Sequence, residues 1–157
     1  MSTQSFPQDD SLSDIKTYQV GALESGAHRM LRQYKDALLK PYGLSGMEWY
    51  VIGTVADSGP SGVRTTDLAN QLGTTIGFMT KTINLLVAKD ILQRISNQDD
   101  ARSSFVSLNP SYATTIDEIE SVLRDKLRTS IYGHLSREEL LVYIKALHTL
   151  ANITRTK

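Results

Sequence analysis

Cysteine is absent from this sequence of 157 residues, and long apolar runs are absent too. Without thiols the chain can form no disulfide, no thiolate zinc site and no thiol redox switch, which fits the reducing cytoplasm. No stretch approaches the roughly 20 apolar residues that span a membrane, so we expect no membrane partner. Residues 1–11 are polar and acidic without an apolar core. We therefore expect a disordered leader there and not a signal peptide.

Net charge is also absent, because 17 basic residues balance 17 acidic ones. Most nucleic-acid-binding domains carry a basic excess, so overall charge gives no sign of such a partner. Signatures of catalysis are missing as well: the sequence shows no nucleophile motif, no glycine-rich phosphate loop and no helical pair of acidic residues. We predict that the chain is not an enzyme and holds neither a cofactor nor a metal.

Helical periodicity is what the sequence does contain, and it is clearest at both ends. Residues 12–40 carry apolar side chains at three- and four-residue spacing, and Pro41 ends this helix. Residues 110–157 repeat the pattern around a break at Gly133, after which Ser136 and its i+3 glutamate form a capping box. These stripes are longer than a small lobe can cover. We therefore expect both segments to pair with a second copy of the chain.

Between these segments lie a helix that starts at Ser45 and two short helices in succession. The first short helix covers residues 67–72, follows two threonines that can cap it, and ends at Gly73. The second runs from about Thr75 to Lys89, again after a pair of capping threonines. Its apolar stripe has helical period and consists of Ile76, Met79, Ile83, Leu86 and Val87.

A change to strand character follows the last of these helices. Residues 91–95 and 105–108 favour two short strands, and the polar segment 96–101 favours a turn, which together predict a β-hairpin. Two short helices joined by a glycine turn and followed by a hairpin make a winged helix-turn-helix. We predict a mainly α fold with a small β-wing. Residues 12–157 would then form a single unit, with the winged lobe at 45–108.

The order of these segments and their amino-acid sequences resemble those of the MarR (multiple antibiotic resistance regulator) family. The resemblance extends from about Ile15 to Ile153, and its most specific part is Asp100 and Arg102, an Asp-x-Arg pair at the family's wing position. Further matching segments are Tyr42–Trp49, Arg64–Gly73, Met79–Leu86, Lys89–Arg94 and Val106–Leu108. The resemblance implies a cytoplasmic homodimer that binds a pseudo-palindromic operator in double-stranded DNA, with half-sites about 34 Å apart, as a repressor.

The resemblance also implies which residues meet DNA: Thr66, Thr75, Gly77, Phe78, Thr80, Lys81, Asn84, Arg94, Asp100 and Arg102. Arg102 would enter the minor groove while Asp100 braces it, and Thr66 would bring backbone amides to a phosphate. Milder alternatives stay open. Thr74 and Thr75 can serve only as caps, Arg94 can brace an acidic neighbour, and Phe78 can meet thymine methyl groups or turn into the protein.

Family members commonly bind a small aromatic or phenolic anion between the dimer helices and the DNA lobe. The residues expected to line such a cleft here are His28, Arg32 and Trp49. His28 and Arg32 share one helix face with Gly21 and Ser25. The alternative is that these small residues only permit close helix packing and that Trp49 belongs to the core.

Two other functions remain to be weighed. A winged-helix protein-interaction module without operator binding would not need Lys81 and Arg102, which are retained. A metal-responsive regulator could use Glu24 and His28, which are spaced i, i+4, but the chain has no cysteine and no second histidine nearby.

Overall fold

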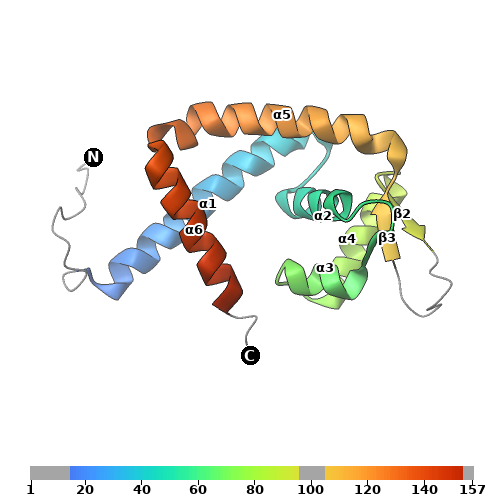
Figure 1. Ribbon diagram of the computed structural model, residues 1–157, viewed down its shortest axis with the longest axis horizontal. Coiled ribbons are helices and arrows are strands. Elements are labelled where there is room, and N and C mark those ends of the chain that lie inside the picture. The colour runs from blue at the N-terminus through green and yellow to red at the C-terminus, as the bar shows by residue number, and fades with distance from the viewer. Residues whose placement is uncertain (1–14, 96–104, 154–157) are drawn as a thin grey trace. The chain divides into compact units, whose positions relative to one another are not determined.

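The structure is a computed structural model that describes residues 15–95 and 105–153 (Figure 1). The chain divides into two compact units, Met1–Gly46 and Met47–Lys157. The leader expected at residues 1–11 and the turn expected at 96–101 lie outside the described residues. Among the helices that are described, none is long and apolar enough to cross a membrane.

The first unit consists mainly of helix α1, Thr17–Leu39. It begins at Thr17 and not near residue 12, because Ile15 and Lys16 are not helical and the Lys16 amide is capped by the Gln19 side chain at 3.0 Å. The short 3-10 helix η2, Lys40–Tyr42, ends it at the expected proline. Of the apolar stripe of α1, only Leu39 is buried. The rest of that stripe is at least partly open to solvent.

The second unit begins with the expected winged lobe, whose sheet has one strand more than predicted. Its helices are α2 (Gly46–Asp57), α3 (Thr65–Gln71) and α4 (Ile76–Ala88). Its strands are β1 (Val63–Arg64), β2 (Leu92–Ile95) and β3 (Phe105–Leu108). The sheet is antiparallel with the order β1-β3-β2, and it lies beside α3 and α4 (Figure 1). The predicted hairpin is therefore present, and β1 was missed.

A continuous apolar core holds the lobe together. Its large, fully buried side chains are Val51, Ile52 and Val55 of α2, Leu68 of α3, Met79, Ile83 and Leu86 of α4, Leu92 of β2, and Val106 of β3. Burying one such side chain stabilises the fold by about 1.5–3 kcal/mol. Ile76 was predicted in the same stripe, and that prediction is wrong, because 55% of its side chain is exposed.

Two longer helices complete the second unit. Helix α5 (Ala113–Ser130) follows the short helix η3 (Pro110–Tyr112) and leads away from the lobe. After η4 (Tyr132–His134), helix α6 (Arg137–Ile153) turns back from the far end of α5 (Figure 1). The capping box expected at Ser136 is confirmed: its hydroxyl accepts from the Glu139 amide at 3.2 Å, and the Glu139 carboxylate accepts from the Ser136 amide at 2.7 Å. The fold class predicted from the sequence is confirmed.

Candidate nucleic-acid interface

The two helices of the helix-turn-helix are α3 and α4, and a tight glycine turn joins them. Gly73 has a φ of 63°, a left-handed conformation that suits glycine. The amide of Thr74 donates to the carbonyl of Ala69 at 2.9 Å and closes the end of α3. Thr75 then caps α4, because its hydroxyl oxygen accepts from the Phe78 amide at 3.2 Å. The predicted cap of the second helix is confirmed.

The start of α3 differs from the prediction. Neither Thr65 nor Thr66 is its cap. The cap is Arg64, whose backbone is extended at φ −72° and ψ 143°. The reason is β1: Arg64 pairs with Phe105 of β3, so the chain is extended up to that residue and turns helical immediately afterwards. Thr65 is buried, and Thr66 is exposed in the first turn of α3, where amides without a partner inside the helix are found.

Helix α4 has one buried face and one open face. Met79, Ile83 and Leu86 pack into the core, whereas Gly77, Lys81 and Asn84 lie on the opposite side and are exposed. Within Ile76–Ala88 the sequence contains a single charged residue, Lys81, and no carboxylate. The predicted contacts Gly77, Lys81 and Asn84 are thus brought together on one surface. That surface presents positive charge and no negative charge.

Of the three threonines in the predicted interface, Thr75 and Thr80 use their hydroxyl groups within α4. Thr75 accepts from the Phe78 amide, as described for the cap. Thr80 is half-buried, and its hydroxyl donates to the Ile76 carbonyl at 2.8 Å. The capping reading of Thr75 therefore has direct support. The polar groups that α4 offers outward are chiefly those of Lys81 and Asn84.

Asn84 is joined to the wing by a hydrogen bond. The Arg94 guanidinium, on β2, donates to the Asn84 side-chain oxygen at 2.6 Å, and both residues are exposed. The sequence suggested either a phosphate contact for Arg94 or a bracing role toward an acidic neighbour. Among the described residues, Asn84 is a neighbour that Arg94 braces. The bond directs the amide nitrogen of Asn84, which is a donor, away from Arg94.

Apolar side chains also reach the open surface of α4. Phe78 is 47% exposed and does not turn into the protein, which removes one of the two alternatives. Ile76 and Leu85 are exposed by more than half. The helical period could not reveal that Ile76 is exposed. Ile76 lies in the first turn of α4, at the edge of the apolar stripe, where it does not pack into the core.

The wing itself is described only at its base. Asp100 and Arg102, the predicted wing-tip pair, lie outside the described residues. At the base, the Arg64 guanidinium stacks over the Phe105 ring at 5.2 Å from its centroid, which links β1 to β3. Sequence reasoning gave Arg64 no role. A strand of two residues leaves no periodic signal by which β1 could have been found.

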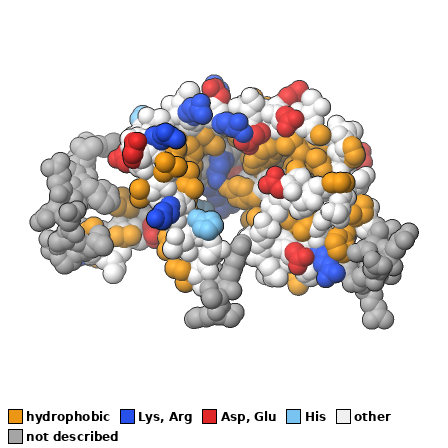
Figure 2. All heavy atoms as spheres, viewed as in Figure 1, with side chains coloured by type: hydrophobic (Ala, Val, Ile, Leu, Met, Phe, Trp, Pro, Cys, Tyr) orange, Lys and Arg blue, Asp and Glu red, His pale blue; other side chains and the backbone are white. Residues whose placement is uncertain are grey.

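Charge in the lobe is sparse and partly paired. Lys89, at the end of α4, donates to the Glu48 carboxylate on α2 at 2.6 Å. This ion pair tethers the end of α4 to α2. Figure 2 shows acidic and basic side chains interspersed on the face in view, without a continuous basic surface. On α4 itself, Lys81 is the cation that can attract a phosphate.

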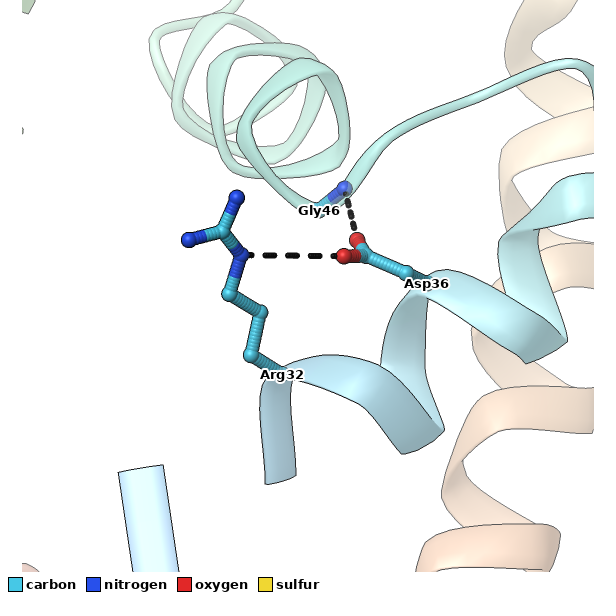
Figure 3. A network of polar contacts seen from close by, with 3 residues as sticks. All are labelled: Arg32, Asp36 and Gly46. Atoms are coloured by element: carbon cyan, nitrogen blue, oxygen red, sulfur yellow. Dashed lines mark hydrogen bonds and ion pairs between the residues drawn. The ribbon is translucent and has the colours of Figure 1, made fainter. Parts of the chain in front are cut away.

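The three residues predicted to line an effector cleft are spread over two helices. His28 and Arg32 are exposed on α1, one turn apart, and Trp49 is half-buried on α2. The Arg32 Nε atom lies 3.7 Å from the Asp36 carboxylate, whose other oxygen accepts from the Gly46 amide at 2.9 Å (Figure 3). Asp36 therefore holds the start of α2, where a carboxylate is favoured. Arg32 is already next to an anion, and the cleft stays a prediction.

A metal site was also considered for the histidines. In the ranges 15–95 and 105–153, no group of three His, Cys, Asp or Glu side chains could hold a metal ion.

Residues 42–103 match the model of the MarR family. The resemblance to the MarR family is confirmed. The matched segment includes the whole helix-turn-helix and both predicted wing residues, and it stops short of α5 and α6.

Solved structures of MarR family regulators share the fold over most of the chain. A mutant MarR from E. coli complexed with operator DNA has a TM-score of 0.69 at 18% identity, covering 87% of this chain and 99% of that one. CouR from Rhodococcus jostii RHA1, bound to p-coumaroyl-CoA, has 0.75 at 17%, covering 91% and 96%. NadR in complex with 4-hydroxyphenylacetate has 0.71 at 23%, covering 92% and 99%. At these identities the likeness shows the MarR winged-helix fold.

Proposed function

We propose that this chain is a sequence-specific DNA-binding transcriptional regulator that acts as a homodimeric repressor. The observation that carries the proposal is the open face of α4, on which Gly77, Lys81 and Asn84 gather without any carboxylate. A helix of this kind fits the major groove of DNA, where its N-terminal residues reach base edges. The match to the MarR family and the operator complex of E. coli MarR support this reading.

Each polar group of the interface has a distinct proposed task. Lys81 neutralises a phosphate, since an exposed lysine binds phosphate as a point charge. Asn84 uses its amide nitrogen to donate to a base edge, with Arg94 holding its oxygen. Thr66 brings the first-turn amides of α3 to a phosphate. Asp100 and Arg102, outside the described residues, remain the predicted minor-groove contact.

A homodimer is proposed because α6 has an apolar face that the described part of the chain leaves uncovered. No residue of α6 is buried, although Ile144, Leu147 and Leu150 recur at helical spacing and each is about half exposed or more. Helix α1 likewise leaves Leu23 and Met30 open, at 55% and 48% exposure. Surfaces of this kind mark protein interfaces. A two-fold dimer would present two α4 helices to two half-sites of a pseudo-palindrome.

Release by a small aromatic or phenolic anion is the proposed means of regulation. CouR and NadR, which share the fold, bind p-coumaroyl-CoA and 4-hydroxyphenylacetate. His28, Arg32 and Trp49 remain the predicted contacts. Such a ligand releases DNA only if it binds the DNA-free conformation more tightly. Titration of 4-hydroxyphenylacetate into the protein–DNA complex tests this directly: the anion should displace DNA, and an unchanged complex at millimolar ligand would count against this ligand class.

DNA binding is tested by fluorescence anisotropy across a salt series, with DNA selected from a random library. Lys81→Ala should weaken binding and lower the salt slope by about two, because each of the two subunits of the dimer no longer neutralises one phosphate. Arg128→Ala removes the same charge from an exposed position on α5 and should leave both quantities unchanged. Equal effects of the two substitutions would contradict the assignment of α4 as the DNA-facing helix.

A further inference from the structure

The first turn of α4 presents two large apolar side chains to solvent, one on each side of Gly77. Ile76 is 55% exposed and Phe78 is 47% exposed. Single exposed apolar residues are ordinary on protein surfaces, whereas two in one turn give the start of α4 a largely apolar surface. A Cβ placed on Gly77 would meet nothing within 4 Å, so the space between the two side chains is open.

The threonine hydroxyl groups of this turn form hydrogen bonds inside the helix. The Thr75 oxygen accepts from the Phe78 amide, and the Thr80 hydroxyl donates to the Ile76 carbonyl. What the first turn offers outward is therefore mainly hydrocarbon. In the major groove, the hydrocarbon partner is the C5-methyl group of thymine, which no other base of unmodified DNA carries.

The charge of α4 favours DNA over an apolar protein surface as the occupant. Lys81 follows one turn after Gly77 and is the only charged residue in the sequence of Ile76–Ala88. A helix with a cation and no carboxylate meets no like-charge repulsion from phosphates. Ile76 and Phe78 lie about 100° to either side of Gly77 around the helix axis, so the two side chains flank the face that Gly77 shares with Lys81.

We propose that Ile76 and Phe78 read thymine methyl groups in each half-site, while Gly77 lets the backbone between them approach the base edges. The inference rests on the proposed function, since it assumes that α4 lies in the major groove. It adds a specificity that the hydrogen-bonding residues do not supply. The operator should carry thymine at defined positions under the first turn of α4, and those positions should be read through their methyl groups.

Replacement of thymine by deoxyuridine tests this, because it removes only the methyl group. In an operator selected by the full chain, deoxyuridine is placed at one thymine position at a time in both half-sites. At one or two positions per half-site, wild-type affinity should fall about fourfold for each methyl group removed. Phe78→Ala and Ile76→Ala should each bind the thymine and deoxyuridine forms equally at their own position. Val122→Ala, which trims an exposed side chain on α5, should keep the full penalty.

The outcomes separate this inference from the function on which it rests. If the wild type selects an operator but no deoxyuridine position weakens binding, methyl reading is wrong and the regulator proposal stands. If Ile76→Ala and Phe78→Ala both retain the full deoxyuridine penalty, the assignment to these side chains is wrong. If no sequence is selected at all, the proposed function fails and the inference fails with it. Thermal unfolding of each variant controls for folding.

Discussion

At the scale of single residues, the bond between Arg94 and Asn84 joins strand β2 of the wing to helix α4. It makes Arg94 a positioning residue for Asn84, whose amide is then held with its donor directed outward. We expect Arg94→Ala to weaken operator binding about tenfold, in line with the removal of one charge-assisted hydrogen bond. In a double-mutant cycle with Asn84→Ala, the two effects should be strongly non-additive, because both variants break the same interaction.

The same cycle distinguishes this role from a direct phosphate contact. If Arg94 touches phosphate instead, its removal should lower the salt slope of binding by about two, one for each subunit of the dimer. Additive effects in the cycle, together with that lower slope, would show that the bond to Asn84 has no function in DNA recognition.

Gly77 provides a residue at which stability and binding should move in opposite directions. It lies within α4, where glycine costs about 1 kcal/mol relative to alanine, and an added Cβ would meet nothing inside the protein. Gly77→Ala should therefore raise the free energy of unfolding by about 0.5–1 kcal/mol while weakening operator binding. Chemical denaturation and anisotropy measure the two quantities. A stabilised variant with unchanged affinity would contradict close approach of the α4 backbone to DNA.

At the scale of secondary-structure elements, the small sheet depends on Gly62. Its φ is 69°, and a Cβ there would lie 2.5 Å from the carbonyl oxygen of Val106 on β3. We expect Gly62→Ala to lower the free energy of unfolding by about 1–3 kcal/mol, because left-handed strain and a backbone clash combine. Gly53→Ala in α2 is the matched control. An added Cβ at Gly53 meets nothing within 4 Å, so this substitution should stabilise the protein slightly. Equal stabilities of the two variants in urea denaturation would contradict this account of the sheet.

The elements that the sequence predicted well are those with strong local signals. The cap at Thr75 and the capping box at Ser136 both follow from side chains within three residues of the bonded amides, and the structure has both. Strand β1 depends instead on pairing with β3, more than 40 residues later in the sequence, so no local pattern could reveal it. The same pairing moved the start of α3 to Thr65.

Within the candidate interface, the sequence identified the right helix but not the surroundings of each side chain. Helical period placed Gly77, Lys81 and Asn84 correctly on one face. It could not show that the bond partner of Arg94 is Asn84, because that contact joins different elements. It also placed Ile76 in the core. Periodicity shows which side of a helix is apolar, but it does not show how far along the helix the core extends.

At the scale of the whole molecule, the exposed apolar face of α6 predicts self-association. Leu147 lies in the middle of this face and is 47% exposed. Leu147→Glu should convert a dimer into a monomer, because a charge buried without a partner at an interface is strongly unfavourable. Lys145→Glu introduces the same carboxylate on another side of α6 and should leave the dimer intact. Sedimentation equilibrium at micromolar concentration measures the mass. A wild-type monomer at that concentration would contradict the role given to this face.

The central claim is that α4 gives this chain sequence-specific binding to double-stranded DNA. The most direct measurement is the ratio of affinities for a library-selected duplex and for random duplex DNA, determined by anisotropy at physiological salt. The account predicts a selected pseudo-palindrome with half-sites about one helical turn apart, bound at least about 10³-fold more tightly than random DNA. Equal affinity for both duplexes, or failure of the library to yield any common sequence, would contradict it.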